Sequence, residues 1–110
     1  MEHNIDLHLF CFPLGVTSQI KTISGMHCFH LIWLRCCLHK TFDGIEIRKK
    51  DRNVVGLSRS SYVRGVCELE EHNIIHVERK SGRLCRISVN TDLLDEKAKA
   101  SILKKGGVTS

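Results

Sequence analysis

The sequence lacks several features that would place it in common protein classes. Proline occurs once and glycine eight times in 110 residues, which argues against a disordered or linker-rich chain. There is no internal repeat and no low-complexity segment. The longest apolar run, residues 26–38, is interrupted by His27, His30 and Arg35, and a membrane span needs roughly 20 apolar residues. We therefore expect this run to form a buried core helix in a single domain.

Cysteine pairs at the spacing typical of redox or zinc motifs are also missing. No CxxC motif occurs, and the opening residues MEHNID lack the positive start of a secretory signal peptide. We therefore expect a reducing cytoplasm and free thiols, several of them packed as small hydrophobic side chains, and a disulfide framework is the less favoured alternative. The six cysteines are Cys11, Cys28, Cys36, Cys37, Cys67 and Cys85.

Motifs that carry catalysis or metal binding are not evident. The chain has no phosphate-binding loop, no nucleophile elbow and no convincing acid–base pair, so we predict that it is not an enzyme and needs no cofactor. Structural zinc usually draws short-spaced ligands from two segments, and a second segment is missing here. Five cysteine and histidine residues cluster in the predicted core helix: Cys28, His30, Cys36, Cys37 and His39. We interpret them as side chains packed on a buried helix and not as metal ligands. A sharper alternative is a thiol redox sensor at Cys67 or Cys85, activated by Arg64 or Arg86.

What the sequence does have is positive charge. It contains 17 basic and 12 acidic residues, for a net charge of +5 and a pI near 9.0. The segment from Arg48 to Arg86 alone contains ten basic and five acidic residues, so it holds the same net charge as the whole chain. A small basic domain favours an anionic partner, nucleic acid first and a membrane surface second. The alternative is a solvated surface with no such partner.

Hydrophobic periodicity predicts the elements of the first half. Residues 5–12 alternate as a strand or extended arm that ends at Pro13, and residues 14–22 have no clear assignment. Apolar residues at three-to-four spacing predict a helix over 25–40 with Ser24 as its N-cap. A short strand over 45–47 and a short helix over 48–55 follow, the helix contributing Val54 and Val55 to the core. Gly56 is expected to end this short helix with a left-handed backbone conformation.

The second half has clearer signals. Ser58 is the expected N-cap of a helix over 59–72, and Asn73 the expected left-handed residue at its end. Its buried stripe is expected to contain Tyr62, Gly65, Val66 and Leu69. Alternation over 75–78 and 84–89 around a turn at 80–83 predicts a two-stranded hairpin. Thr91 is the expected N-cap of a last helix over 92–105.

The stretch RNVVGLSRSSYVRGVCELEEHNIIHVERKSGRLCRISV resembles the winged helix-turn-helix DNA-binding family, in particular small bacterial regulators and phage or plasmid replication-associated proteins. The resemblance covers roughly residues 26–89. It implies an α+β fold with a three-helix core and a C-terminal two-stranded wing. The expected organisation is an N-terminal arm over 1–22, the winged domain over 23–90, and a C-terminal helix and tail over 91–110. Gly65 departs from the family, in which alanine is common, and glycine costs a helix about 1 kcal/mol relative to alanine.

The resemblance implies a recognition helix over about 58–72 in the major groove and a basic wing over 79–86. Short polar and basic side chains at the start of such a helix suit base edges and phosphates. The acidic residues Glu68, Glu70 and Glu71 fall in its second half, which would turn away from DNA. The predicted DNA-binding residues are Lys49, Lys50, Ser58, Arg59, Ser60, Ser61, Val63, Arg64, Arg79, Lys80, Arg83 and Arg86.

The predicted function is therefore double-stranded DNA binding by a cytoplasmic, nucleoid-associated protein. A transcriptional regulator and an accessory of replication or plasmid maintenance both fit. A homodimer formed through residues 5–12 or the last helix is a further hypothesis. The alternative function is a protein-interaction module that docks through Leu93, Leu94, Ile102 and Leu103. No small-molecule substrate and no membrane partner are evident.

Overall fold

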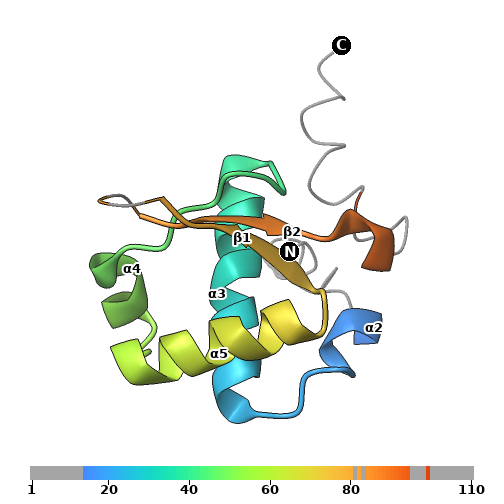
Figure 1. The fold of residues 1–110 in the computed structure, drawn as a ribbon, viewed down its shortest axis with the longest axis horizontal. Coiled ribbons are helices and arrows are strands. Elements are labelled where there is room, and N and C mark those ends of the chain that lie inside the picture. Colours follow the sequence, from blue (N-terminus) through green and yellow to red (C-terminus); the bar gives the residue numbers. More distant parts are fainter. Residues whose placement is uncertain (1–13, 81, 83, 95–98, 100–110) are drawn as a thin grey trace, which may run out of the picture.

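The computed structural model describes residues 14–80, 82, 84–94 and 99. These residues form an α+β arrangement of four helices and a two-stranded antiparallel sheet (Figure 1). In chain order the elements are α2 (Leu14–Thr17), α3 (Ile23–His39), α4 (Lys49–Val54), α5 (Arg59–Glu71), β1 (Ile75–Glu78), β2 (Arg86–Val89) and the 3-10 turn η1 (Thr91–Leu93). The predicted arm over 5–12 and most of the predicted last helix lie outside the described residues.

Helix α3 is the centre of the fold. The Thr22 hydroxyl accepts a hydrogen bond from the Gly25 amide at 2.9 Å, so the helix begins at Ile23. The prediction that Ser24 is the N-cap was therefore wrong, because the hydroxyl two residues earlier already caps the first turn. The helix buries a continuous apolar stripe and ends at Lys40, which has a left-handed backbone (φ 54°). The stripe contains Cys28, Phe29, Leu31, Ile32, Trp33 and Cys36.

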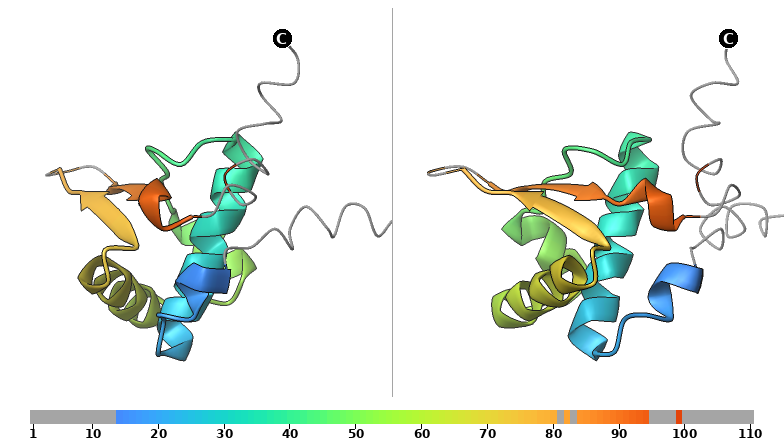
Figure 2. Two further views of the ribbon diagram at one scale, coloured as in Figure 1. Left: turned by 90° about the vertical axis from the view of Figure 1, so that its right-hand side faces the viewer. Right: turned by 45° about the vertical axis from the view of Figure 1, so that its right-hand side comes forward.

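The sheet lies across α3 (Figures 1 and 2). Its register pairs Ile75 with Val89 and Val77 with Ile87, and these four apolar residues face the core while the alternate residues of β1 face solvent. The predicted strand over 45–47 is reduced to one bridge, in which Ile45 and Ile87 exchange two backbone hydrogen bonds of 2.9 and 2.8 Å. A third extended segment therefore flanks β2 on the side away from β1.

Helix α5 crosses α3 and packs on it through its predicted stripe (Figure 1). Gly65, Val66 and Leu69 are buried, as predicted. A Cβ atom added at Gly65 would come within 2.6 Å of the Ser24 carbonyl oxygen and 2.7 Å of the Cys28 Cβ. Only glycine lets the two backbones approach this closely, so the helix contact accounts for glycine at this position despite its cost in helix propensity of about 1 kcal/mol relative to alanine.

Both ends of α5 match the sequence signals. The Ser58 hydroxyl accepts a hydrogen bond from the Ser61 amide at 3.2 Å, and Asn73 has a left-handed backbone (φ 58°). Gly56 is likewise left-handed (φ 70°) after α4. These three positions fix where α5 begins and ends relative to α4.

Two predictions on the shorter elements were wrong. Val54 is 84% exposed, so it adds nothing to the core, whereas Val55 packs partly buried against the core as predicted. Polar contacts also attach helix α4, because the His27 ring nitrogen lies 2.9 Å from the Val55 carbonyl oxygen and Arg35 lies 3.5 Å from Asp51. Thr91 does not cap a long helix. It lies inside η1, which is capped by the Asn90 side chain.

Glu68 of α5 joins the start of α3. Its carboxylate accepts hydrogen bonds from the Thr22 hydroxyl and from the Lys21 amide, the latter at 2.6 Å, and its side chain is 11% exposed. Burial disfavours the charged form, but these hydrogen bonds outweigh it, so the pKa of Glu68 lies below its ordinary value. The carboxylate thus stabilises the helix N-terminus and the α3–α5 contact together.

Glu68→Gln is expected to lower the free energy of unfolding by about 1–2 kcal/mol at pH 7, because charge-assisted hydrogen bonds are lost. A depressed folded-state pKa contributes stability above the unfolded-state pKa and loses it as the pH falls through the folded-state pKa. The difference between variant and wild type should therefore shrink below about pH 4.5, the ordinary Glu value. Urea unfolding from pH 7 to pH 3 measures it. Glu71→Gln, the exposed neighbour on the same helix, is the control, and an equal loss there would contradict the assignment.

Candidate nucleic-acid interface

The first half of α5 presents short polar and basic side chains to solvent. Arg59, Ser60 and Arg64 are exposed, Val63 is 49% exposed, and Ser61 is half-buried. Ser60 and Arg64 lie on the side of the helix opposite its buried stripe, because α5 is packed against α3 through Gly65, Val66 and Leu69. Arg59 is nearer to the stripe and is exposed at the first turn.

The two arginines keep their charge free for a partner. Arg59 has no ion-pair partner among the described residues, and Arg64 only donates a 3.4 Å hydrogen bond to the Ser61 hydroxyl. No acidic residue occurs in the first turn of α5. This end of the helix therefore combines the positive end of the helix dipole with two side-chain cations.

The predicted binding residues from three elements lie on one side of the molecule. The first turn of α5, helix α4 and the outer ends of the two strands are all on the left in Figure 1. In both panels of Figure 2 the hairpin extends to the left beyond the helices. Three elements that are separated along the chain, α4, the start of α5 and the outer ends of the strands, therefore share one side of Figure 1.

The hairpin cations are largely balanced by carboxylates. Arg79 makes two hydrogen bonds with Glu70, of 2.7 and 3.0 Å, and the bond from Arg79 lowers the pKa of that carboxyl. Lys80 lies 3.8 Å from Glu78, and Arg86 lies 3.7 Å from Glu46. Arg83 lies outside the described residues. The hairpin thus offers less free positive charge than its sequence indicates.

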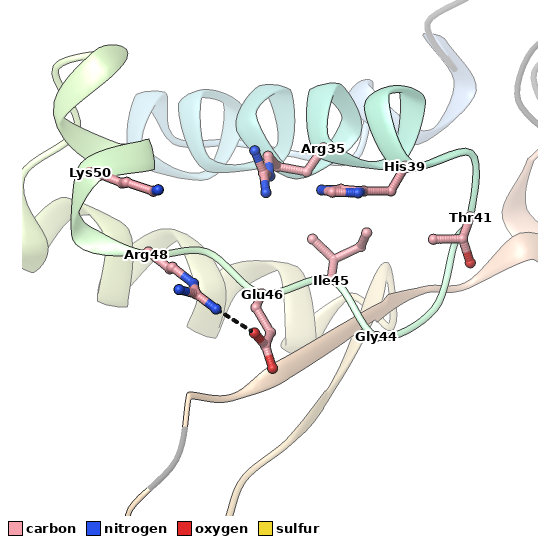
Figure 3. Close-up of a pocket in the computed structure, with 8 residues that line it drawn as sticks. All are labelled: Arg35, His39, Thr41, Gly44, Ile45, Glu46, Arg48 and Lys50. Atoms are coloured by element: carbon pink, nitrogen blue, oxygen red, sulfur yellow. Dashed lines mark hydrogen bonds and ion pairs between the residues drawn. The ribbon is translucent and has the colours of Figure 1, made fainter.

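The two lysines of α4 differ in position. Lys49 is exposed and has no ion-pair partner within the described ranges. Lys50 lines a cavity between α3, α4 and the segment that joins them (Figure 3). Sequence reasoning also missed Arg52, whose guanidinium lies 5.7 Å from the centre of the Tyr62 ring and thereby joins α4 to α5. No local signal marks this pair, because the two residues lie on separate helices.

The thiols fall into two groups. Cys28 and Cys36 are fully buried, and burial raises the pKa of each to about 12, so neither is a nucleophile in the folded protein. Cys67 and Cys85 line one small apolar cavity of about 180 Å³ between α5 and the hairpin. The described cysteines are all free, and no three His, Cys, Asp or Glu side chains in the described part of the chain group together to hold a metal ion.

Comparison with family models, curated proteins and solved structures finds no match to this chain. No helix within the described residues is long and apolar enough to cross a membrane.

Proposed function

We propose that the protein binds double-stranded DNA as a winged helix-turn-helix protein, with α5 as the recognition helix in the major groove. The observation that carries this proposal is the start of α5, where Arg59 and Arg64 are exposed and have no ion-pair partner among the described residues. The planar guanidinium group of arginine can donate two parallel hydrogen bonds to the edge of a guanine base or to phosphate oxygens. Val63 supplies an apolar contact of the kind that recognises the thymine methyl group.

The order of elements supports the winged-helix assignment. A core helix, a short bridged segment, a second helix, a recognition helix and an antiparallel hairpin follow one another, and the Ile45–Ile87 bridge adds a third segment beside β2. This arrangement is compatible with a winged helix. The close contact between α3 and α5 at Gly65 holds the recognition helix rigidly, as base readout requires.

In this proposal the helix carries more of the affinity than the hairpin. Arg79 would have to leave Glu70 before it could contact a phosphate, and Lys80 and Arg86 have acidic neighbours as well. We infer that the Glu70–Arg79 pair positions the hairpin beside α5. Phosphate contacts are then assigned mainly to Lys49, Arg59 and Arg64.

Part of the surface that the protein-interaction alternative requires is buried. Leu94 is 6% exposed and Leu93 packs partly buried against the core, so neither is free to dock a partner. Ile102 and Leu103 lie outside the described residues. We further propose that the protein acts in transcription control or replication. Phosphate contacts that do not depend on sequence would also associate it with the nucleoid.

Amide chemical-shift mapping tests where DNA binds. Titration of the isotope-labelled protein with a random-sequence duplex should shift the amides of residues 58–64 and 49–50 most, and those of residues 91–94 least. The reason is that only the first group lies on the proposed surface. Shifts concentrated on the hairpin, with α5 unaffected, would contradict a helix-led interface.

A further inference from the structure

A cavity of about 370 Å³ lies between α3, the 44–48 segment and the start of α4 (Figure 3). Arg35 and His39 extend into it from successive turns of α3, and Lys50 reaches towards it from α4. The wall opposite α3 is formed by the connecting segment. The lining residues are Arg35, His39, Thr41, Gly44, Ile45, Glu46, Arg48 and Lys50.

The charge of this cavity is positive after its internal pairs are taken into account. Glu46 is the acidic group in the lining, and it already lies 3.4 Å from Arg48 and 3.7 Å from Arg86. Asp51, beside the cavity, lies 3.5 Å from Arg35. The lining therefore holds three permanent positive charges, on Arg35, Arg48 and Lys50, against the two carboxylates of Glu46 and Asp51, with His39 in addition.

Some donors in the cavity remain unused. The Nε of Arg35 is buried and has no hydrogen-bond partner in the described part of the chain. Lys50 has no ion-pair partner there either. The Arg35 side chain as a whole is 27% exposed, so a negatively charged ligand in the cavity can approach its guanidinium although the Nε itself is buried.

We propose that this cavity is a binding site for a phosphate group. Donors from two helices and the connecting segment surround one space, an arrangement suited to the several oxygens of a tetrahedral anion. Two sources supply this chemistry, a free phosphate-bearing small molecule and the backbone of bound DNA. The site does not depend on the DNA-binding proposal.

The first arm of the test uses calorimetric titration of inorganic phosphate and of ribose 5-phosphate at constant ionic strength. Lys50→Gln and Arg35→Gln should each weaken binding by about tenfold, because each removes a charge-assisted hydrogen bond. Lys21→Gln is the matched control, since it makes the same charge change at the other end of α3 and outside the lining. Affinity for that variant should stay within about twofold of the wild type.

The second arm identifies the source of the phosphate. If DNA supplies it, Lys50→Gln should weaken duplex binding and reduce the slope of log K against log salt by about one, and inorganic phosphate should compete with the duplex. If a small molecule supplies it, duplex affinity and slope should not change in Lys50→Gln. Lys21→Gln, at the other end of α3, is the control in this arm.

Two results would overturn the phosphate site. One is the absence of saturable phosphate binding by the wild type, and the other is an equal loss in Lys21→Gln and Lys50→Gln. Failure of the wild type to bind any duplex would instead count against the proposed function, and it would leave the phosphate titration in the first arm intact.

Discussion

Reversing the charge of both arginines at the start of α5 is expected to abolish DNA binding. Arg59→Glu/Arg64→Glu should weaken affinity for a random-sequence duplex roughly a hundredfold or more at low salt, because two charge-assisted contacts are lost and two repulsive ones are added. Both side chains are exposed to solvent. The variant should therefore unfold at the same urea concentration as the wild type. Fluorescence anisotropy with a labelled duplex measures the affinity.

Lys21→Glu/Lys40→Glu is the matched control for that experiment. It makes the same change in net charge at two exposed lysines that flank α3. If the control lost as much affinity as the arginine variant, total charge would explain the binding and α5 would not be the contact. A folded arginine variant that still bound DNA as the wild type does would contradict the recognition-helix assignment.

Gly65→Ala is expected to destabilise the protein although alanine is the better helix former. The added methyl group would meet the Ser24 carbonyl oxygen at 2.6 Å, which is backbone of the neighbouring helix and can move only if α3 and α5 separate. Overpacking of this kind costs roughly 1–3 kcal/mol, which exceeds the gain of up to about 1 kcal/mol in helix propensity. A net loss of about 1–2 kcal/mol should lower the melting temperature by roughly 10 °C.

Gly15→Ala provides the opposite expectation within the same chain. Gly15 lies in α2, and apart from its chain neighbours and the backbone of its own helix no described atom lies within 4 Å of the position that its Cβ would take. This variant should be as stable as the wild type or slightly more stable. Thermal unfolding monitored by circular dichroism compares the two. A melting temperature for Gly65→Ala at or above that of the wild type would show that the helices do not pack as closely as described.

Local signals in the sequence predicted much of the second half of the fold. Ser58, Asn73 and Gly56 mark helix ends through their own side-chain or backbone chemistry, so each could be recognised without knowledge of its neighbours. The alternation of Ile75 and Val77 predicted the hairpin for the same reason. The wrong cap on α3 has a local cause too, because Thr22 and Ser24 both carry a hydroxyl and only the geometry decides between them.

The electrostatics of the candidate site could not be predicted in this way. Arg79, one of the predicted DNA-binding residues, is paired with Glu70 on a different element. Lys50, another of them, lines a cavity beside Arg35. Glu68 was expected only to point away from DNA, but it stabilises the start of α3. These contacts join groups brought together by the tertiary packing of separate elements, which no periodic pattern encodes.

The most direct test of the central claim is the affinity of the wild-type protein for a random-sequence duplex, measured by anisotropy from 50 to 200 mM salt. Three phosphate contacts, at Lys49, Arg59 and Arg64, predict that affinity falls by a factor of roughly 40 over this range. Binding at low salt that weakens in this way would support a phosphate-contacting surface. No binding at 50 mM salt would contradict the DNA-binding function.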